Sequence, residues 1–187
     1  MVWLALAGAA TAQTATAQTA TAQTATANPV CGPGILRANG SFDLARIGPL
    51  IAGAWTEQAY GLTVATGVQS TSLVIVHDSM RGRIYVQADG AQLELTMVRG
   101  ERHPMGWDPL NDRPIHPDER LLDPRVGASE DFLERENCEW DAAPQFSWEF
   151  RTPRGTSAGY LTFISPNAAI GVKWNSAMGS REQLLTR

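Results

Sequence analysis

Three histidines, His77, His103 and His116, are the side chains best suited to acid–base chemistry near neutral pH. His77 ends a β-branched run beside Asp78, and an adjacent carboxylate can orient an imidazole as a general base. If the protein is an enzyme, His77 and Tyr85 are therefore the catalytic candidates. The histidines lack metal-ligand spacing and the chain has no Cys-x-x-Cys pair, so we expect neither a metal nor a cofactor.

Residues 155–159 (GTSAG) satisfy Gly-x-Ser-x-Gly, the nucleophile pattern of α/β-hydrolases. That site needs a helix after the serine, then an acid and a histidine further along the chain. Here residues 160–164 (YLTFI) are typical of a strand, and neither His nor Asp follows Ser157. The sequence therefore favours a hairpin loop over a serine hydrolase.

Five aromatic residues on expected strands are candidates for contact with a ligand, because small-molecule sites are often lined by aromatic side chains. Ordinary core packing explains the same residues and remains the alternative. Glu57, Glu94 and Glu149 stand opposite apolar neighbours, and we expect them to point outward into solvent. The five candidate ligand-binding residues are Tyr85, Phe146, Trp148, Tyr160 and Trp174.

Alternating apolar and polar residues bounded by turn residues predict seven or eight strands. Asp89-Gly90 is a strong signal for a two-residue hairpin. Regular spacing favours an all-β antiparallel up-and-down barrel, with a sandwich as the alternative. The expected strands are 54–62, 72–77, 83–88, 92–98, 145–151, 158–164, 169–175 and 181–186.

One long proline-rich insertion, 100–144, interrupts this pattern. Residues 129–138 within it are typical of one short helix, and we expect at most one helix in the fold. Connections this long often form lids or binding loops, so the insertion is expected to cover one mouth of the barrel. A surface excursion is the simpler alternative.

The first 27 residues predict export. Residues 1–10 (MVWLALAGAA) resemble the apolar part of a signal peptide, and a threefold AQTAT repeat follows without large apolar side chains. We expect 1–27 to be unfolded or removed, 28–187 to form a single domain, and the protein to be secreted or periplasmic. The net charge of −4 argues against nucleic acid as a partner, and no apolar run is long enough to span a membrane.

The only two cysteines are Cys31 and Cys138. An even number of cysteines in an exported protein favours a disulfide. We expect this bond to fasten the N-terminal extension to the body of the domain.

Residues 47–51 (IGPLI) followed by Gly53-Ala54-Trp55 resemble the Gly-x-Trp entry of lipocalin-like (calycin) β-barrels. In that family the motif follows a short 3₁₀ turn, and the Trp packs under an Arg from the end of the barrel. The resemblance implies that Arg181 or Arg187 takes that part here. It also implies an apolar cavity for a small hydrophobic molecule, or an enzyme built in that cavity.

Two principal classes of function follow. The first is an exported barrel that binds a small apolar or aromatic molecule in an apolar and aromatic cavity. The alternative is a cavity enzyme, a lyase, isomerase or cyclase, which needs an inward-pointing ionisable residue such as His77, Tyr85, Arg83 or Glu94. A structural domain with a filled barrel is the third reading. Strand parity distinguishes the first two.

Overall fold

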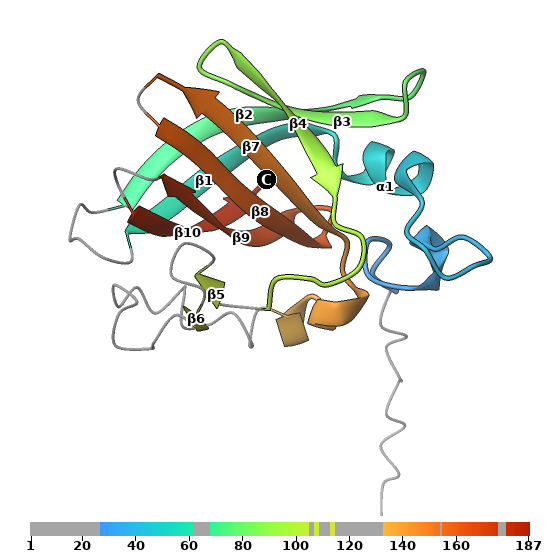
Figure 1. The fold of residues 1–187 in the computed structure, drawn as a ribbon. Coiled ribbons are helices and arrows are strands. Elements are labelled where there is room, and N and C mark those ends of the chain that lie inside the picture. Colours follow the sequence, from blue (N-terminus) through green and yellow to red (C-terminus); the bar gives the residue numbers. More distant parts are fainter. Residues whose placement is uncertain are drawn as a thin grey trace, which may run out of the picture.

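The computed structural model describes residues 27–61, 68–104, 107–108, 113–114, 133–153, 155–175 and 179–187. Eight antiparallel strands form a closed barrel in the order β1-β10-β9-β8-β7-β4-β3-β2 (Figure 1). This confirms the predicted up-and-down barrel. The strands are β1 (Gly53–Gly61), β2 (Val68–Asp78), β3 (Arg83–Ala88), β4 (Ala91–Met97), β7 (Gln145–Thr152), β8 (Gly155–Ser165), β9 (Ala168–Asn175) and β10 (Gly179–Thr186).

Local turn chemistry sets the hairpins. Asp89 and Gly90 join β3 to β4 and have φ angles of 49° and 77°, the left-handed pair that a tight hairpin with right-handed twist requires. In the resulting register Ile84 pairs with Leu95 and Val86 with Leu93, so these apolar side chains share the inward face.

A helix covers one end of the barrel. Helix α1 (Leu44–Ile51) begins at Asp43, whose carboxylate accepts a hydrogen bond from the Ala45 amide at 3.1 Å. Ile47 and Ile51 are fully buried in the main core cluster. The sequence pattern did not predict this α-helix, because Gly48 and Pro49 lie within it and both have poor helix propensity.

The core lies at the end covered by α1, which we call the helix-covered half. Its inward side chains are apolar and form one cluster with the helix. The buried barrel residues of this cluster are Trp55, Leu73, Ile75, Ile84, Leu95, Phe146, Leu161, Phe163, Ala169 and Leu185.

The predicted Cys31–Cys138 disulfide is present. It lies with a small apolar cluster, including Ile164 and Ala168, at the ends of β8 and β9 near the helix-covered half. Asn28 extends this attachment, because its side-chain amide donates to the backbone carbonyls of Glu136 and Ile164 at 2.7 and 2.6 Å. The disulfide therefore does fasten the N-terminal extension to the barrel.

The described parts of the insertion leave and rejoin the barrel at the helix-covered end, and they pack on its outer wall. Short strands β5 (Trp107–Asp108) and β6 (Arg113–Pro114) pair with each other there. The Tyr160 hydroxyl donates to the Trp107 carbonyl at 3.2 Å, and the His103 ring stacks on Tyr160 with centroids 4.7 Å apart. The expectation that the insertion covers one mouth of the barrel stays a prediction. The segment 115–132 lies outside the described residues. Of the predicted helix 129–138, residues 133–138 are described, and only 133–135 are helical.

Candidate functional site

The half of the barrel opposite α1, which we call the far half, carries polar and charged side chains on its inward face. Their direction follows from the register, because cross-strand partners share a face and alternate residues change face. Glu57 lies two residues beyond buried Trp55, and Lys173 pairs with Arg181. The inward polar residues include Glu57, Ser157, Lys173, Asn175, Arg181 and Gln183, and on β2 also Gln69 and Thr71.

Two of these side chains converge on the carboxylate of a third. Lys173 Nζ on β9 lies 2.6 Å from Glu57 Oε1 on β1, and Gln183 Nε2 on β10 donates to the same oxygen. The side chain of Glu57 is 8% exposed and that of Lys173 is 26% exposed. Because an isolated buried carboxylate is costly, the ion pair and the amide together make the burial of Glu57 tolerable.

Gln183 leaves an acceptor in this network. The residue is 6% exposed, and its Oε1 atom is buried without a hydrogen-bond partner among the described residues. Buried polar atoms are normally satisfied, so this oxygen is a place for a donor from a ligand or a water molecule. On the neighbouring strands Asn175 Nδ2 donates to Ser157 Oγ at 2.7 Å.

The expectation that Glu57 points into solvent was wrong. Glu94 and Glu149 are exposed, as expected, but Glu57 has the parity of Trp55 and is buried. Lys173 was not singled out either, although it is the only lysine in the chain. Two sequence signals were available: the spacing of Glu57 from Trp55, and the position of Lys173 between Gly171 and Asn175 on one strand face.

Aromatic side chains occupy the inward face of β7. The Trp148 ring lies across Gly159 of β8, where an added Cβ would come within 2.7 Å of the indole. Phe150 shares this inward parity and is nevertheless 41% exposed. Solvent therefore reaches the inside of the far half along β7.

The barrel wall is weakly paired beside these aromatics. Strand β4 pairs with β7 only at Thr96–Ser147 and Met97–Phe146, close to the helix-covered end. Beyond these two pairs, residues 91–95 of β4 and 148–152 of β7 have no ladder pairing with each other. The far half thus has a polar wall on β1 and β8–β10, an aromatic wall on β7, and a loose seam between β4 and β7.

The five predicted ligand-contacting residues do not share one face. Phe146 and Trp148 point inward, and Phe146 is fully buried in the core cluster. Tyr160 and Trp174 have the opposite parity and lie on the outer wall, where His103 of the insertion contacts both rings. Tyr85 also points outward, opposite Glu94 of β4. Of the five, Trp148 alone lies on the inward face without being fully buried, and it packs against the edge of the core cluster.

The two predicted catalytic residues are separated. His77 has inward parity but lies under α1, because an added Cβ on Gly48 would come within 2.4 Å of its ring. Its Nε2 atom is buried without a partner among the described residues. Tyr85, Arg83 and Glu94 point outward, and Arg83 Nη1 lies 2.9 Å from Glu94 Oε2. Neither His77 nor Tyr85 therefore faces the polar wall of the far half.

Trp55 packs under an arginine from the end of the barrel, as the resemblance implies, and that arginine is Arg187. Its guanidinium carbon lies 4.6 Å from the centre of the indole, and Nη2 donates to the Ala52 carbonyl at 2.6 Å. Gly53 makes room for this arrangement, because its φ is 138° and a Cβ added there would lie only 3.4 Å from the guanidinium. Partial burial lowers the pKa of Arg187.

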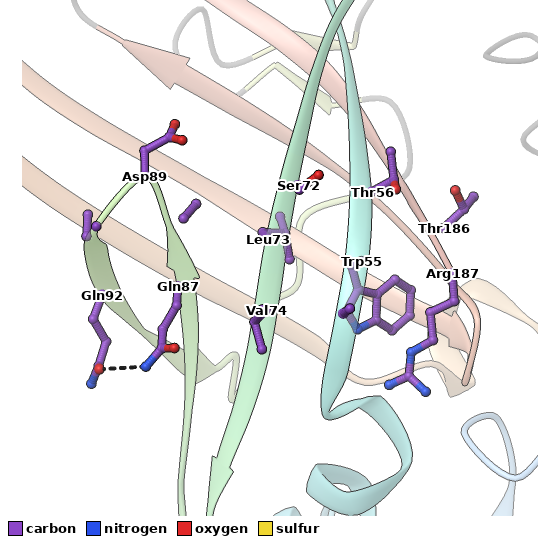
Figure 2. A pocket seen from close by; sticks show the side chains of 14 residues that line it. Trp55, Thr56, Ser72, Leu73, Val74, Gln87, Asp89, Gln92, Thr186 and Arg187 are labelled. Carbon is purple, nitrogen blue, oxygen red and sulfur yellow. Dashed lines mark hydrogen bonds between the residues drawn. The ribbon is translucent and has the colours of Figure 1, made fainter.

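A separate hollow of about 660 Å³ lies over β1, β2 and the β3–β4 hairpin (Figure 2). Its exposed side chains are mainly hydroxyls and amides, and Gln87 Nε2 donates to Gln92 Oε1 at 3.0 Å. Arg187 at its edge is already engaged by Trp55 and Ala52. Its two charged side chains, Asp89 and Arg187, lie on opposite sides of the hollow (Figure 2), so the far half, where charged groups meet, is the stronger candidate for a site.

No protein-family model, curated protein or solved structure matches this chain. The fold is an eight-stranded antiparallel barrel compatible with the lipocalin-like architecture, and the function has to be inferred from the geometry of the site.

Proposed function

We propose that this protein binds a small amphipathic molecule inside the far half of its barrel. The observation that carries the proposal is the convergence of Lys173, Gln183 and Glu57 from three strands on the inward face. The polar end of the ligand is placed at these groups and its aromatic or apolar part against Trp148. This revises the expected ligand, because one wall of the site is charged rather than apolar.

Three features support binding over a filled barrel. Inward-pointing Lys173 and Phe150 keep substantial exposure, whereas packed cores bury such positions. Gln183 offers a buried acceptor. The short β4–β7 pairing provides a seam through which a ligand can enter. The lipocalin-like architecture is part of the same proposal and is supported by the packing of Arg187 over Trp55.

Titration with a fluorescent probe tests this function. We expect 1-anilinonaphthalene-8-sulfonate, an aromatic anion, to bind saturably and to accept excitation energy from Trp148. Trp148→Phe should weaken the affinity for this probe. Trp174→Phe, which changes a tryptophan on the outer wall, should leave that affinity unchanged. Equal effects of the two substitutions, or no saturable binding with an intact circular dichroism spectrum, would exclude a ligand site in the far half.

Charge selectivity adds a second comparison. Lys173→Met should lower the affinity for the anionic probe more than the affinity for its neutral analogue N-phenyl-1-naphthylamine, because the substitution removes a cation but little apolar volume. If both probes lose affinity equally, Lys173 has a structural role and does not contact the ligand.

Catalysis is the alternative function, and in that case Glu57 and Lys173 would be the acid–base pair. It would replace simple binding if a ligand were consumed and Lys173→Met abolished turnover while a neutral probe still bound.

We also propose that the protein is exported. The Cys31–Cys138 bond supports this, since disulfides persist in oxidising compartments. No helix among the described residues is long and apolar enough to cross a membrane. Intact-mass analysis of protein from the periplasm or culture supernatant should show a chain starting between residues 10 and 28. Full-length chain found only in the cytosol would contradict export.

A further inference from the structure

Two hollows meet on the outer surface beside the helix-covered end. Their volumes are about 620 and 420 Å³, and Met97, Val98 and Arg99 line both. The first extends along β4 to His103, and the second runs between the turn at 37–42 and the beginning of the insertion. We call the two together the arginine groove, after the four arginines in its lining: Arg37, Arg83, Arg99 and Arg102.

The charged side chains that line this groove are mostly positive, whereas the net charge of the whole chain is negative. The formal net charge of the protein is −4, yet Glu94 is the one carboxylate in the described lining, against four guanidinium groups. Glu94 is paired with Arg83 at 2.9 Å. Outside the lining, Asp43 approaches Arg37 at 3.7 Å and is shared with Arg46.

Arg99 belongs to both hollows and is exposed. Within the described part of the chain it has no ion-pair partner, so its guanidinium is available to an incoming anion. The imidazole of His103 stands at the end of the first hollow, and burial lowers its pKa.

The walls of the second hollow are held in place by hydrogen bonds. Arg102 donates from Nη1 to the Asp141 carbonyl at 2.7 Å and from Nη2 to the Trp140 carbonyl at 2.9 Å. Its Nε atom is buried without a partner among the described residues. Opposite it, the Asn39 carboxamide oxygen accepts from the amide and hydroxyl of Ser41 at 3.1 and 2.7 Å. A preformed wall lowers the entropic cost of binding.

The desolvation of Arg102 also favours the binding of an anion in this groove. Burial lowers the pKa of Arg102, and the charge of Asp141 opposes that change only in part. A bound anion would offset the remaining cost of holding this guanidinium partly out of water.

We propose that the arginine groove binds a small phosphate or sulfate ester. Guanidinium groups match tetrahedral oxyanions through paired, charge-assisted hydrogen bonds, and several of them around one hollow favour a multiply charged group over a monocarboxylate. The space exceeds that of one oxyanion, which leaves room for an organic part. This site is separate from the far half of the barrel.

Calorimetric titration of the full chain with inorganic pyrophosphate, and separately with sulfate, tests the proposal when NaCl holds the ionic strength constant. Arg99→Gln should weaken binding at least about fivefold, since it removes one charge-assisted contact in a solvated groove. Arg151→Gln is the matched control, because Arg151 is 81% exposed and lies at the other end of β7. Unchanged melting temperatures would show that both variants fold.

The two titrations also separate the possible sources of the oxyanion. Binding of pyrophosphate alone identifies phosphate esters, binding of sulfate alone identifies sulfate esters, and binding of both supports the shared chemistry. Absence of saturable heat for either anion, or equal weakening by Arg99→Gln and Arg151→Gln, would overturn the proposal. Lys173→Met should have no effect here, which distinguishes this site from the one inside the barrel.

Discussion

The two halves of the barrel are built from the same strands but differ in what those strands direct inward. Strand β1 carries Trp55 into the helix-covered half and Glu57 two residues further on, and β9 carries Ala169 and then Lys173. One half is therefore packed and capped by α1, whereas the other holds an ion pair and half-exposed side chains. The packed core and the proposed ligand site therefore lie in different parts of the same strands, and substitutions in the two halves should have different consequences.

Reduction of the Cys31–Cys138 disulfide should have the largest effect on stability. The cysteines are 107 residues apart, and the chain-entropy model gives about 4 to 5 kcal/mol for a loop of this length. Because the bond lies near the helix-covered half, affinity for the anionic probe should survive below the melting temperature. Urea unfolding with and without reductant measures the loss. A change below about 1 kcal/mol would contradict the chain-entropy estimate.

A matched pair of truncations on β8 compares the two halves directly. Phe163→Ala should cost about 3 to 5 kcal/mol, because the side chain is fully buried between Trp55 and Phe146. Ser157→Ala on the same strand should cost about 1 kcal/mol, the value of one hydrogen bond with Asn175. Similar losses in chemical denaturation would mean that the far half is packed as tightly as the core.

Substitutions in the Glu57–Lys173 pair test whether this network binds a ligand or only stabilises the fold. Glu57→Ala leaves the Lys173 ammonium partly buried and should cost about 1 to 3 kcal/mol, below the full value for a buried pair because Lys173 is 26% exposed. The double variant Glu57→Leu, Lys173→Met should restore stability and still lose the preference for the anionic probe. A double variant less stable than Glu57→Ala alone would assign the pair a structural role.

The smallest expected effect is on the outer wall, at His103. Burial lowers the pKa of His103 below its ordinary value of 6.5, so the unfolded chain binds the proton more readily. The contribution of His103 to stability is therefore present above pH 6.5 and is lost as the pH falls from 6.5 through the pKa of the folded state. Unfolding free energies of the wild type and His103→Gln should diverge in that window. Parallel pH profiles would show that His103 is solvated.

The strands could be predicted from the sequence because alternation and turn residues are local signals. The expected strand 83–88 matches β3, and Asp89-Gly90 forms the expected hairpin. The direction of Tyr160 and Trp174 could not be judged, since both faces of β8 are buried once the insertion covers the outer wall. The proposed site was not predicted because Glu57 and Lys173 are 116 residues apart and become partners only when the barrel closes.

Lys173 is the only lysine, so reductive methylation with ¹³C-formaldehyde labels one side chain and the N-terminal amine, which serves as an internal reference. Methylation keeps the positive charge. If the far half is the binding site, titration with 1-anilinonaphthalene-8-sulfonate should shift the dimethyl-Lys173 resonance saturably, with the dissociation constant found by fluorescence, and leave the reference unmoved. A Lys173 resonance that stays in place while the probe saturates the protein would contradict a ligand site in the far half.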